Sequence, residues 1–374
     1  MFDPKSIDLP VVDIIDEVND KLNTQNTLIV NAPPGAGKST LLPLAFLDLD
    51  WLEGQKIIML EPRRLAARSI AERMSSLLGE KVGETIGYRI RFDSRVSEKT
   101  KIEVVTEGIL TRMLQSDNSL EGIKMVIFDE FHERSIHADV ALALCREAQQ
   151  VLREDLRILI MSATLNMPQL TSLLKSEAVV SKGRQYPVDI NYEGDIDEYV
   201  MAEMCAKTIQ KAIKSHEGDV LAFLPGQGEI HKTADSLRGK VGGARIHLLY
   251  GALPQNKQRA AIFPDKNGQR KIVLATSIAE TSLTIEGVNI VVDSGFGRHS
   301  QFDPNSGLSR LETHRISRDS ADQRAGRAGR LSPGVAYRLW SKVTHGRLTD
   351  HIIPEIEQAD LASLVLEMAN WGIS

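Results

Sequence analysis

The chain has 374 residues, which at about 150 residues per domain predicts two complete domains and part of a third. With 42% hydrophobic and 25% charged residues, its composition excludes a disordered chain, a collagen-like repeat and a disulfide scaffold. The formal net charge of −5 argues against a nucleic-acid-binding protein that is basic throughout. Residues 298–330 nevertheless contain seven arginines against four acidic residues, so we expect a local basic patch.

Short runs rich in β-branched residues alternate with longer amphipathic stretches along most of the chain. The first series of predicted strands is 27–32, 56–60, 102–106, 125–129 and 158–162, with helical patterns such as 65–78 and 138–152 between them. After a linker-like stretch at 182–187, further strands are predicted at 188–192, 220–224, 246–249, 272–275 and 290–293. Continuous apolar strands separated by helices predict parallel sheets covered on both faces. We therefore expect an α/β protein with two similar domains.

The C-terminal segment departs from this alternation. Residues 354–371 form one amphipathic pattern with Pro354 near its start, which predicts a single helix. A lone helix cannot bury its own apolar face, so we expect it to pack on the α/β domains or to begin a third domain.

Several classes of protein are disfavoured by the pattern of the chain. Cys145 and Cys205 lie far apart in apolar helical patterns without a C-x-x-C spacing, which predicts buried thiols rather than a metal or redox site. The first residues have no signal-peptide pattern, and no apolar run has the length of a membrane span. These features predict a cytoplasmic protein.

A glycine-rich loop follows the first predicted strand and precedes a helical pattern, which is the context that a phosphate-binding P-loop requires. In such a loop, backbone N–H groups and the helix N-terminus surround phosphate oxygens. Lys38 is expected to reach the β- and γ-phosphates, and the Ser39 hydroxyl is expected to bind Mg²⁺. Ala32 stands where the usual motif has glycine. The expected nucleotide-binding residues are Pro34, Gly35, Ala36, Gly37, Lys38, Ser39 and Thr40.

Two adjacent carboxylates, Asp129 and Glu130, follow the strand predicted at 125–129, at the end where open parallel sheets place their ligands. Asp129 is expected to hold Mg²⁺, directly or through water. Glu130 is expected to orient and deprotonate the attacking water in phosphoryl transfer. A solvated pair of loop carboxylates is the alternative, and the P-loop argues against it.

A third group of residues is the sequence Q-R-A-G-R-A-G-R at 323–330. At helical spacing, Gln323, Arg327 and Arg330 share one face, and the two glycines allow close approach to another surface. Arginines that approach the γ-phosphate from a second domain would complete catalysis. The alternative is a basic helix face in solvent, which leaves the spaced glycines unexplained.

These residues resemble motifs I, II, III and VI of superfamily 2 helicases: A-P-P-G-A-G-K-S, D-E-F-H, S-A-T at 162–164, and Q-R-A-G-R-A-G-R. Between them, E-P-R-R at 61–64 and T-E-G at 106–108 are similar to motifs Ia and Ib. A-T-S-I-A-E-T-S-L-T at 275–284 is similar to motif V of the DEAH/RHA branch. The form D-E-F-H-E-R is similar to the bacterial HrpB-type members.

The resemblance implies two tandem RecA-like parallel-sheet domains, at 1–182 and 183–348, followed by the start of a helical, winged-helix domain at 349–374. It also implies that the later domains of the family lie outside this chain. The stretch 301–310 resembles the hairpin that DEAH-type second domains place at one end of the RNA track.

Roles for individual residues are implied by position in these motifs. His132 would couple motif II to Gln323 or to Ser162 and Thr164, with a structural histidine as the alternative. Gln323, Arg327 and Arg330 would join Lys38, Asp129 and Glu130 in catalysis. Arg73 and Phe263 would stack on either side of the base and discriminate poorly among nucleotides, with a surface arginine and a core phenylalanine as the alternatives. The implied RNA-backbone contacts are Arg63, Thr106, Glu107, Gly108, Gly226, Thr276 and Thr284.

The function implied is a monomeric RNA helicase core that hydrolyses ATP or another NTP with Mg²⁺ and moves 3′ to 5′ along single-stranded RNA, with single-stranded DNA as a further possible partner. One alternative is a superfamily 2 translocase on double-stranded DNA. A second alternative is a nucleotide-gated RNA clamp or assembly factor, which has less need for Lys38, Glu130, Arg327 and Arg330 together.

Overall fold

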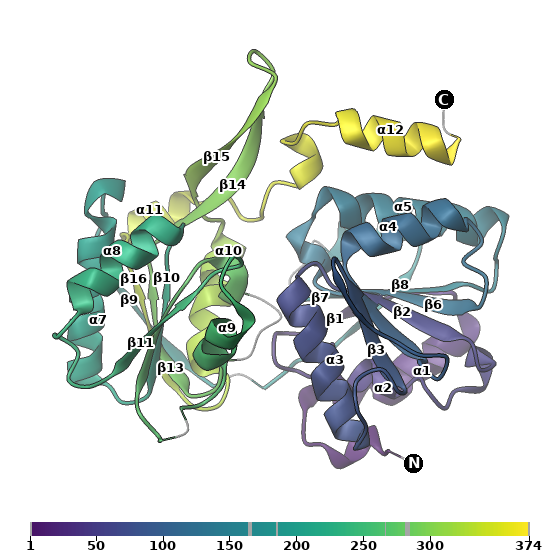
Figure 1. Ribbon diagram of the computed structural model, residues 1–374, viewed down its shortest axis with the longest axis horizontal. Helices are drawn as coiled ribbons and strands as arrows, with labels where there is room; N and C mark the ends of the chain where they lie inside the picture. The colour runs from purple at the N-terminus through teal and green to yellow at the C-terminus, as the bar shows by residue number, and fades with distance from the viewer. Residues whose placement is uncertain (1, 164–166, 185, 266, 281–284, 373–374) are drawn as a thin grey trace. The chain divides into compact units, whose positions relative to one another are not determined.

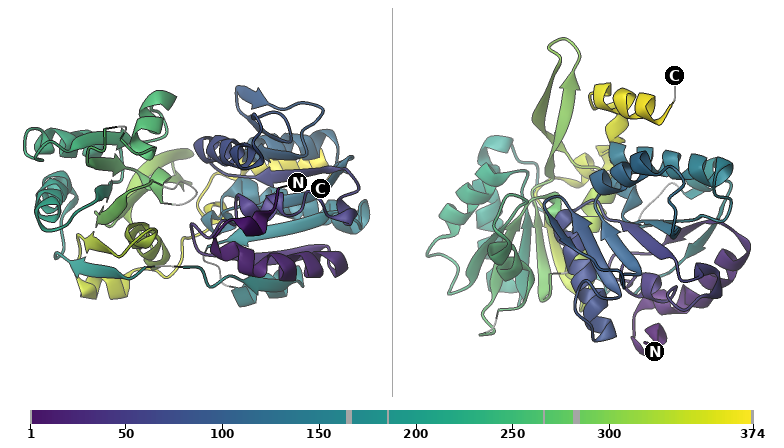
Figure 2. Two further views of the ribbon diagram at one scale, coloured as in Figure 1. Left: turned by 90° about the horizontal axis from the view of Figure 1, so that it is seen from below. Right: turned by 45° about the vertical axis from the view of Figure 1, so that its right-hand side comes forward.

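The computed structural model describes residues 2–163, 167–184, 186–265, 267–280 and 285–372. The chain divides into two compact units (Figure 1). Unit 1 comprises Met1–Gly183 together with Ile353–Ser374, and unit 2 comprises Arg184–Ile352. In each unit, helices cover both faces of a sheet, as Figures 1 and 2 show.

Unit 1 is built on an eight-stranded sheet with the order β4-β3-β5-β2-β6-β7-β1-β8. All pairs are parallel except β3 with β4, at one edge. The central strands are buried along their whole length, which is why they read as continuous apolar runs. The strands are β1 (Thr27–Asn31), β2 (Lys56–Leu60), β3 (Ile86–Ile90), β4 (Asp93–Arg95), β5 (Ile102–Val105), β6 (Ile123–Phe128), β7 (Arg157–Ser162) and β8 (Glu177–Val180).

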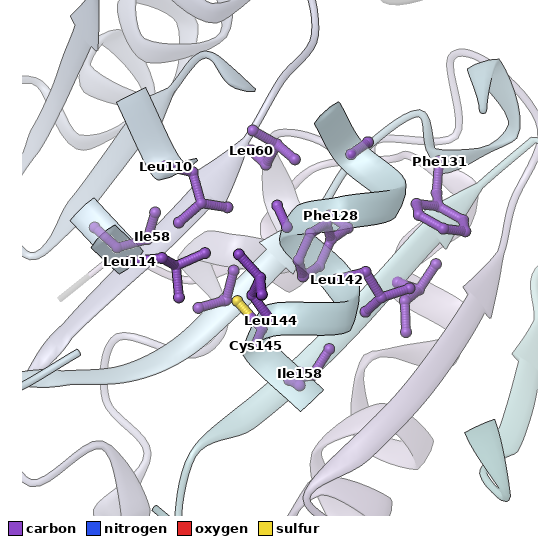
Figure 3. Close-up of a cluster of buried hydrophobic side chains, with 14 of the residues drawn as sticks. Ile58, Leu60, Leu110, Leu114, Phe128, Phe131, Leu142, Leu144, Cys145 and Ile158 are labelled. Atoms are coloured by element: carbon purple, nitrogen blue, oxygen red, sulfur yellow. The ribbon is translucent and has the colours of Figure 1, made fainter. Parts of the chain in front are cut away.

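The helices of unit 1 are α1 (Ile15–Thr24), α2 (Leu41–Leu44), α3 (Arg64–Leu78), α4 (Glu107–Ser116), α5 (Ile136–Val151), α6 (Met167–Leu174) and α12 (Ala362–Trp371). Figure 3 shows how Leu110 and Leu114 of α4 and Leu144 and Cys145 of α5 meet side chains of β2, β6 and β7 in one buried cluster. Apolar side chains of the C-terminal segment, including Trp371, pack against the same cluster. This core fixes the strand ends that carry the motifs.

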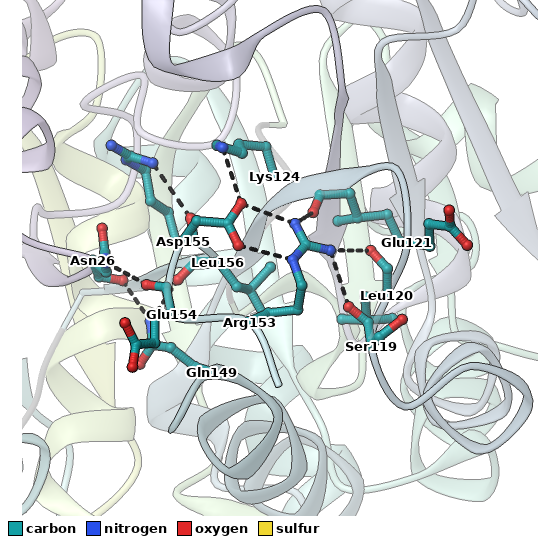
Figure 4. A network of polar contacts seen from close by, with 12 residues as sticks. Asn26, Ser119, Leu120, Glu121, Lys124, Gln149, Arg153, Glu154, Asp155 and Leu156 are labelled. Carbon is teal, nitrogen blue, oxygen red and sulfur yellow. Dashed lines mark hydrogen bonds and ion pairs between the residues drawn. The ribbon is translucent and has the colours of Figure 1, made fainter. Parts of the chain in front are cut away.

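A polar network holds the loops at the amino ends of β6 and β7 (Figure 4). The Arg153 guanidinium donates to carbonyl oxygens of Ser119 and Leu120, each at 3.1 Å, and pairs with Asp155 at 2.8 Å. Lys124 also pairs with Asp155, at 2.9 Å. These two cations hold the pKa of the Asp155 carboxyl well below its usual range.

Unit 2 contains a six-stranded, entirely parallel sheet with the order β11-β12-β10-β13-β16-β9. Its strands are β9 (Val188–Tyr192), β10 (Asp219–Phe223), β11 (Arg245–Leu249), β12 (Lys271–Ala275), β13 (Val288–Asp293) and β16 (Gly334–Arg338). Its helices are α7 (Met201–Ser215), α8 (Gln227–Leu237), α9 (Gln255–Ile262), α10 (Arg318–Gly326) and α11 (Lys342–Arg347). A separate antiparallel hairpin, β14 (Phe296–Asp303) with β15 (Leu308–Arg315), projects from the unit (Figure 1).

The predicted fold class is confirmed, since both units are parallel α/β sheets, and every predicted strand is present within two residues at its start and one at its end. The hairpin is also present and is longer than its predicted turn region. Sequence reasoning missed β3, β4, β8 and β16, which are short or lie toward the sheet edges. Both cysteines are fully buried, as predicted.

The prediction of one helix over 354–371 is wrong. A 3-10 turn at Glu355–Glu357 comes first, and α12 begins only at Ala362. Between them, the Asp360 carboxylate accepts a hydrogen bond from the Ala362 N–H at 2.9 Å. Asp side chains compete with the helical backbone in this way and favour helix starts over helix interiors. The segment packs on unit 1, which agrees with the expectation that it packs on the α/β domains. That it begins a winged-helix domain stays a prediction.

Candidate nucleotide and nucleic-acid sites

The order of strands in unit 1 brings five sequence motifs together at the carboxyl ends of its central strands. The P-loop follows β1, motif II follows β6, motif Ia follows β2 and motif Ib follows β5, and motif III begins with Ser162 at the end of β7. These strands are parallel neighbours in the order β5-β2-β6-β7-β1, so their carboxyl ends lie side by side. Motif II therefore lies between the nucleotide-type motifs on one side and the nucleic-acid-type motifs on the other.

The P-loop backbone has the left-handed conformations that its glycines permit, with φ of +85° at Gly35 and +94° at Gly37. The N-terminal segment supports the loop, because the Val11 N–H donates to the Ala36 carbonyl oxygen at 2.9 Å. A Cβ added at Gly37 would lie 3.0 Å from Leu9 Cδ1. This position therefore needs glycine both for its backbone angles and for its packing.

The helix after the P-loop is shorter than the sequence pattern suggested. The α2 helix is a single turn of four residues that contains Pro43, which lacks the N–H donor of an ordinary helical residue. A helix of one turn contributes little macrodipole, so phosphate binding in this loop would depend mainly on backbone N–H groups and Lys38.

Lys38, Asp129 and Glu130 form a buried charge cluster in unit 1. Lys38 Nζ lies 2.8 Å from Glu130 Oε1 and 4.0 Å from Asp129 Oδ1, and each of the three residues is at most 3% exposed. Burial alone would lower the pKa of Lys38, but the charges of Glu130 and Asp129 outweigh it and raise that pKa above its usual value. Burial also raises the pKa of Asp129 to about 6, against the lowering effect of Lys38.

Divalent cation chemistry fits this cluster. The buried carboxylates of Asp129, Glu130 and Glu61 outnumber the single Lys38 ammonium, and the Ser39 hydroxyl lowers the pKa of the Asp129 carboxyl by hydrogen bonding. A hydroxyl and a carboxylate are the few protein oxygens that Mg²⁺ takes when phosphates and water supply the rest. In the part of the chain that the structure describes, no group of three or more His, Cys, Asp or Glu side chains could hold a metal ion by itself.

The turn that carries motif II is strained at two positions. Glu130 and Arg134 have φ of +51° and +50°, values that are uncommon for residues other than glycine. Between them, Phe131–Glu133 form one 3-10 turn in which His132 is buried, with Nδ1 at 3.5 Å from Glu130 Oε2. Ser162 is fully buried at the end of β7, and Thr164 lies outside the described residues.

The residues of motifs Ia and Ib occupy the starts of two helices. Arg63 is the N-cap residue of α3, and Thr106 is the N-cap residue of α4, directly before Glu107. Arg63 Nη2 lies 3.1 Å from Glu133 Oε1. A Cβ added at Gly108 would meet no atom within 4 Å, so the backbone here is open to a ligand on that side.

Sequence reasoning missed a group of residues next to motif Ib. The Ser135 hydroxyl donates to the Glu107 carboxylate, and the Ile136 N–H donates to Glu355 Oε2 at 3.0 Å. Burial raises the pKa of Glu107 to about 7; the Ser135 hydrogen bond lowers it, and the charges of Glu133 and Glu355 raise it further. Glu133 and Ser135 could have been found from the Glu-Arg-Ser sequence that directly follows D-E-F-H. Glu355 is distant in the chain and gave no such signal.

Motif VI of unit 2 differs from the continuous helix that the spacing predicted. The α10 helix ends at Gly326, and Arg327–Gly329 form a 3-10 turn. Gln323 and Arg327 are buried and Arg330 is half-buried, so a basic face in solvent is excluded. A Cβ at Gly329 would lie 2.5 Å from the Tyr186 carbonyl oxygen, so this glycine does allow close approach.

Arg324 is the most deeply buried arginine of motif VI, at 2% exposed. Its guanidinium pairs with Glu280 at 3.0 Å and with Asp293 at 2.9 Å, and it lies over the Phe223 ring. Arg327 donates from Nε to the Glu280 carbonyl oxygen at 2.9 Å. Motif V and motif VI are therefore joined inside unit 2 through Glu280.

The candidate RNA contacts of unit 2 follow two adjacent strands. Gly226 follows β10 as the N-cap residue of α8, and Thr276 follows β12; Thr284 lies outside the described residues. A Cβ at Gly226 would collide with the guanidinium of Arg298, which donates to Glu229 Oε1 at 3.2 Å. The glycine therefore makes room for an arginine that sequence reasoning did not single out.

The two residues expected to stack on the base belong to different units. Arg73 lies on the exposed side of α3 in unit 1. Phe263 follows α9 in unit 2 and is 45% exposed, with the Arg259 guanidinium 5.1 Å from the centre of its ring. Phe263 is therefore not a core residue, and its stacking role stays a prediction.

Comparison with known proteins agrees with these motifs. Residues 13–173 match the DEAD/DEAH box helicase family, and residues 203–332 match the helicase conserved C-terminal domain. The chain belongs to the DEAD/DEAH-box helicases. Within this family it is 48% identical to the ATP-dependent RNA helicase HrpB of Escherichia coli and 37% identical to the ATP-dependent RNA helicase HrpA of Borreliella burgdorferi.

Each of these alignments covers 98% of this chain and 45% of the relative, so the chain spans about half the length of the helicases that it matches. The crystal structure of the E. coli DEAH/RHA helicase HrpB matches 98% of this chain with a TM-score of 0.93 at 47% identity, and the chain covers 47% of it. A second crystal structure, of the E. coli DExH-box NTPase HrpB, matches with a TM-score of 0.87. Among the described residues, no helix has the length and apolar character needed to cross a membrane.

Proposed function

We propose that this helicase core hydrolyses ATP, and other NTPs, with Mg²⁺ and uses the hydrolysis to move along single-stranded RNA. The observation that carries the proposal is the buried cluster in which Lys38 of the P-loop contacts Glu130 of motif II at 2.8 Å, beside Asp129. Such a cluster is costly to bury unless it serves a charged ligand. Its relatives, named as ATP-dependent RNA helicases, support RNA as the partner.

The geometry suggests an order of events at the P-loop. Lys38 is the partner of Glu130 in the state described here. A β- or γ-phosphate oxygen that takes the Lys38 ammonium would remove this cation from Glu130, which raises the ability of the Glu130 carboxylate to accept a proton from the attacking water. Ser39 and Asp129 would hold Mg²⁺, which supplies positive charge to the phosphates when bound. His132 Nδ1 lies 3.5 Å from Glu130 Oε2, and His132 and Ser162 are proposed to relay the state of the nucleotide.

Unit 2 is proposed to contribute Gln323, Arg327 and Arg330 to the γ-phosphate, in the manner of arginine fingers. Arg63, Thr106, Glu107 and Gly108 of unit 1 and Gly226, Thr276 and Thr284 of unit 2 are proposed to hold the RNA backbone. Contacts to phosphate and sugar position a strand without reading its sequence, so the proposed movement is independent of sequence.

The test is the rate of NTP hydrolysis by the 374-residue chain with single-stranded RNA, single-stranded DNA, double-stranded DNA or no nucleic acid. We expect the largest stimulation with RNA. Glu130→Gln should lower the turnover number by about 10²–10⁴-fold while nucleotide binding persists. Glu121→Gln removes the same charge at an exposed position of unit 1 and serves as the matched control.

Lys38→Ala should weaken nucleotide binding itself. Unchanged hydrolysis in Glu130→Gln would refute its role as the base. Stimulation by double-stranded DNA alone would identify a DNA translocase, and RNA binding that depends on nucleotide without turnover would identify a clamp.

A further inference from the structure

The motif II turn carries an ion pair at each end. Glu130 contacts Lys38 of the P-loop at 2.8 Å, and Glu133, three residues later, contacts Arg63 of motif Ia at 3.1 Å. This arrangement follows from the sheet order, since β6 has β2 on one side and β7, next to β1, on the other. The turn is therefore in direct contact with both the candidate nucleotide site and a candidate RNA contact.

The turn is tightly constrained between these two ion pairs. The Glu133 N–H donates to the Glu130 carbonyl oxygen at 3.0 Å, and the left-handed backbone of Glu130 and Arg134 leaves few alternative conformations. Phe131 is 4% exposed and packs edge-on against Phe128, with ring centres 6.3 Å apart. A turn with this bonding and packing is expected to transmit a displacement of Glu133 to Glu130 rather than absorb it.

The charges around Glu133 make its ion pair with Arg63 replaceable. The side chains of Arg63 and Glu133 are 21% and 19% exposed, so a phosphate of a bound strand can reach the guanidinium. The charges of Glu133 and Glu355 both act on the Glu107 carboxyl, so Glu107 lies close enough to Glu133 to interact with it electrostatically. If a phosphate takes the Arg63 guanidinium, the ion pair that joins Glu133 to motif Ia is broken, and repulsion from the nearby Glu107 carboxyl favours displacement of Glu133.

We propose that Glu133 is a positioning residue through which RNA binding controls the motif II turn. Without RNA, Arg63 holds Glu133 and with it the resting turn; an RNA phosphate replaces Glu133 on Arg63, and the released turn reorients Glu130 for hydrolysis. The inference rests on the proposed function, because it requires RNA-stimulated hydrolysis. Glu133 and an RNA phosphate compete for Arg63 in this scheme. By thermodynamic linkage, the Arg63–Glu133 ion pair must therefore weaken RNA binding by the chain in its resting state.

The test compares Glu133→Gln with the wild-type chain in NTP hydrolysis, with and without oligouridylate, and in oligouridylate binding measured by fluorescence anisotropy. Without RNA, the variant should hydrolyse NTP about two- to fivefold faster, since a partly exposed ion pair contributes roughly this factor to an equilibrium. Its stimulation ratio should fall by a similar factor, and it should bind oligouridylate more tightly. A purely structural role would not raise the RNA-free rate and the RNA affinity together.

Asp155→Asn is the matched control. It removes one carboxylate from an arginine pair of the same unit, at 2.8 Å from Arg153, at the opposite ends of β6 and β7 (Figure 4). We expect its stimulation ratio to equal that of the wild type. If Glu133→Gln shows no cooperative thermal transition, Glu133→Asp, which keeps the charge but shortens the side chain, should shift the same quantities in the same direction.

The outcomes are distinguishable. Normal RNA stimulation in the wild type together with an unchanged ratio and unchanged RNA affinity in the Glu133 variants overturns the inference and leaves the proposed function intact. A wild-type chain that hydrolyses NTP without any response to RNA overturns the proposed function, and the inference with it.

Discussion

Replacement of Arg324 by methionine should destabilise unit 2 strongly, although this arginine belongs to a motif associated with catalysis. Its guanidinium is 2% exposed and pairs with Glu280 and Asp293, which are 5% and 2% exposed. Removal of the cation leaves two buried carboxylates without the guanidinium charge that balances them. Breaking a buried pair in this way costs about 3–5 kcal/mol. Burial already raises the pKa of Asp293, so this carboxyl can take up a proton and relieve part of the cost, while the charge of Glu280 is still buried.

The assay is urea unfolding followed by the fluorescence of Trp340, which is buried in unit 2. Trp51 and Trp371 belong to unit 1 and are replaced by phenylalanine, so that the signal reports on unit 2 alone. With a urea dependence of about 1–3 kcal/mol per molar, the midpoint for Arg324→Met should fall by at least about 1 M. Arg238→Met is the control, because Arg238, directly after α8, forms an exposed pair with Asp235 and should shift the midpoint only slightly.

Equal midpoints for Arg324→Met and Arg238→Met would refute this reasoning. A second check is the addition of Asp293→Asn and Glu280→Gln to Arg324→Met. Neutral side chains in place of a complete buried ionic group are often tolerated, so the triple variant should recover part of the lost stability. Further loss in the triple variant would show that hydrogen bonds, rather than unpaired charge, determine the effect.

Three further predictions concern stability and reactivity. Because the pKa of Glu107 is raised from 4.5 to about 7 in the folded protein, the folded state binds more protons than the unfolded state between these values, and its free energy of unfolding falls as pH rises through this window. Glu107→Gln should remove up to about 3 kcal/mol of this pH dependence, measured by urea unfolding at pH 5 and pH 8; equal slopes in both proteins would contradict the assignment. Gly329→Ala should lower the unfolding free energy of unit 2 by about 1–3 kcal/mol, since the new Cβ would lie 2.5 Å from a carbonyl oxygen, whereas Gly326→Ala, which meets no atom within 4 Å, should be tolerated. Burial raises the pKa of both Cys145 and Cys205, so a thiol reagent should label them only at the rate of unfolding, and rapid labelling of the native chain would disprove their burial.

The motifs and the α/β class were accessible from the sequence because each depends on residues that are close in the chain. The P-loop was recognisable from its strand, its glycines and Lys38, and Asp129 and Glu130 from the apolar strand before them. The strands β2 and β9 have the predicted ends, and each is bounded by Gly or Pro within a few residues on both sides; β2 is a buried apolar run, whereas β9 alternates apolar and polar residues. Local patterns of this kind persist because buried parallel strands need apolar side chains at every position.

Helix lengths were less accessible, because they depend on competition between local backbone preferences. The helix after the P-loop is a single turn containing Pro43, motif VI changes from α-helix to 3-10 turn at Arg327, and the C-terminal segment breaks before α12. In the last case the Asp360 side chain takes a backbone N–H that a continuous helix would use otherwise. Hydrophobic periodicity does not register such competition.

Tertiary structure alone decided which of these motifs meet. The strand order β5-β2-β6-β7-β1 differs from the chain order, and it sets motif II between the P-loop and motif Ia. The contacts of Lys38 with Glu130 and of Arg63 with Glu133 join residues that are 92 and 70 positions apart. Sequence determined which charged groups this helicase core possesses, whereas their pairing depends on strand order, because only neighbouring strands bring their carboxyl ends within reach of one ion pair.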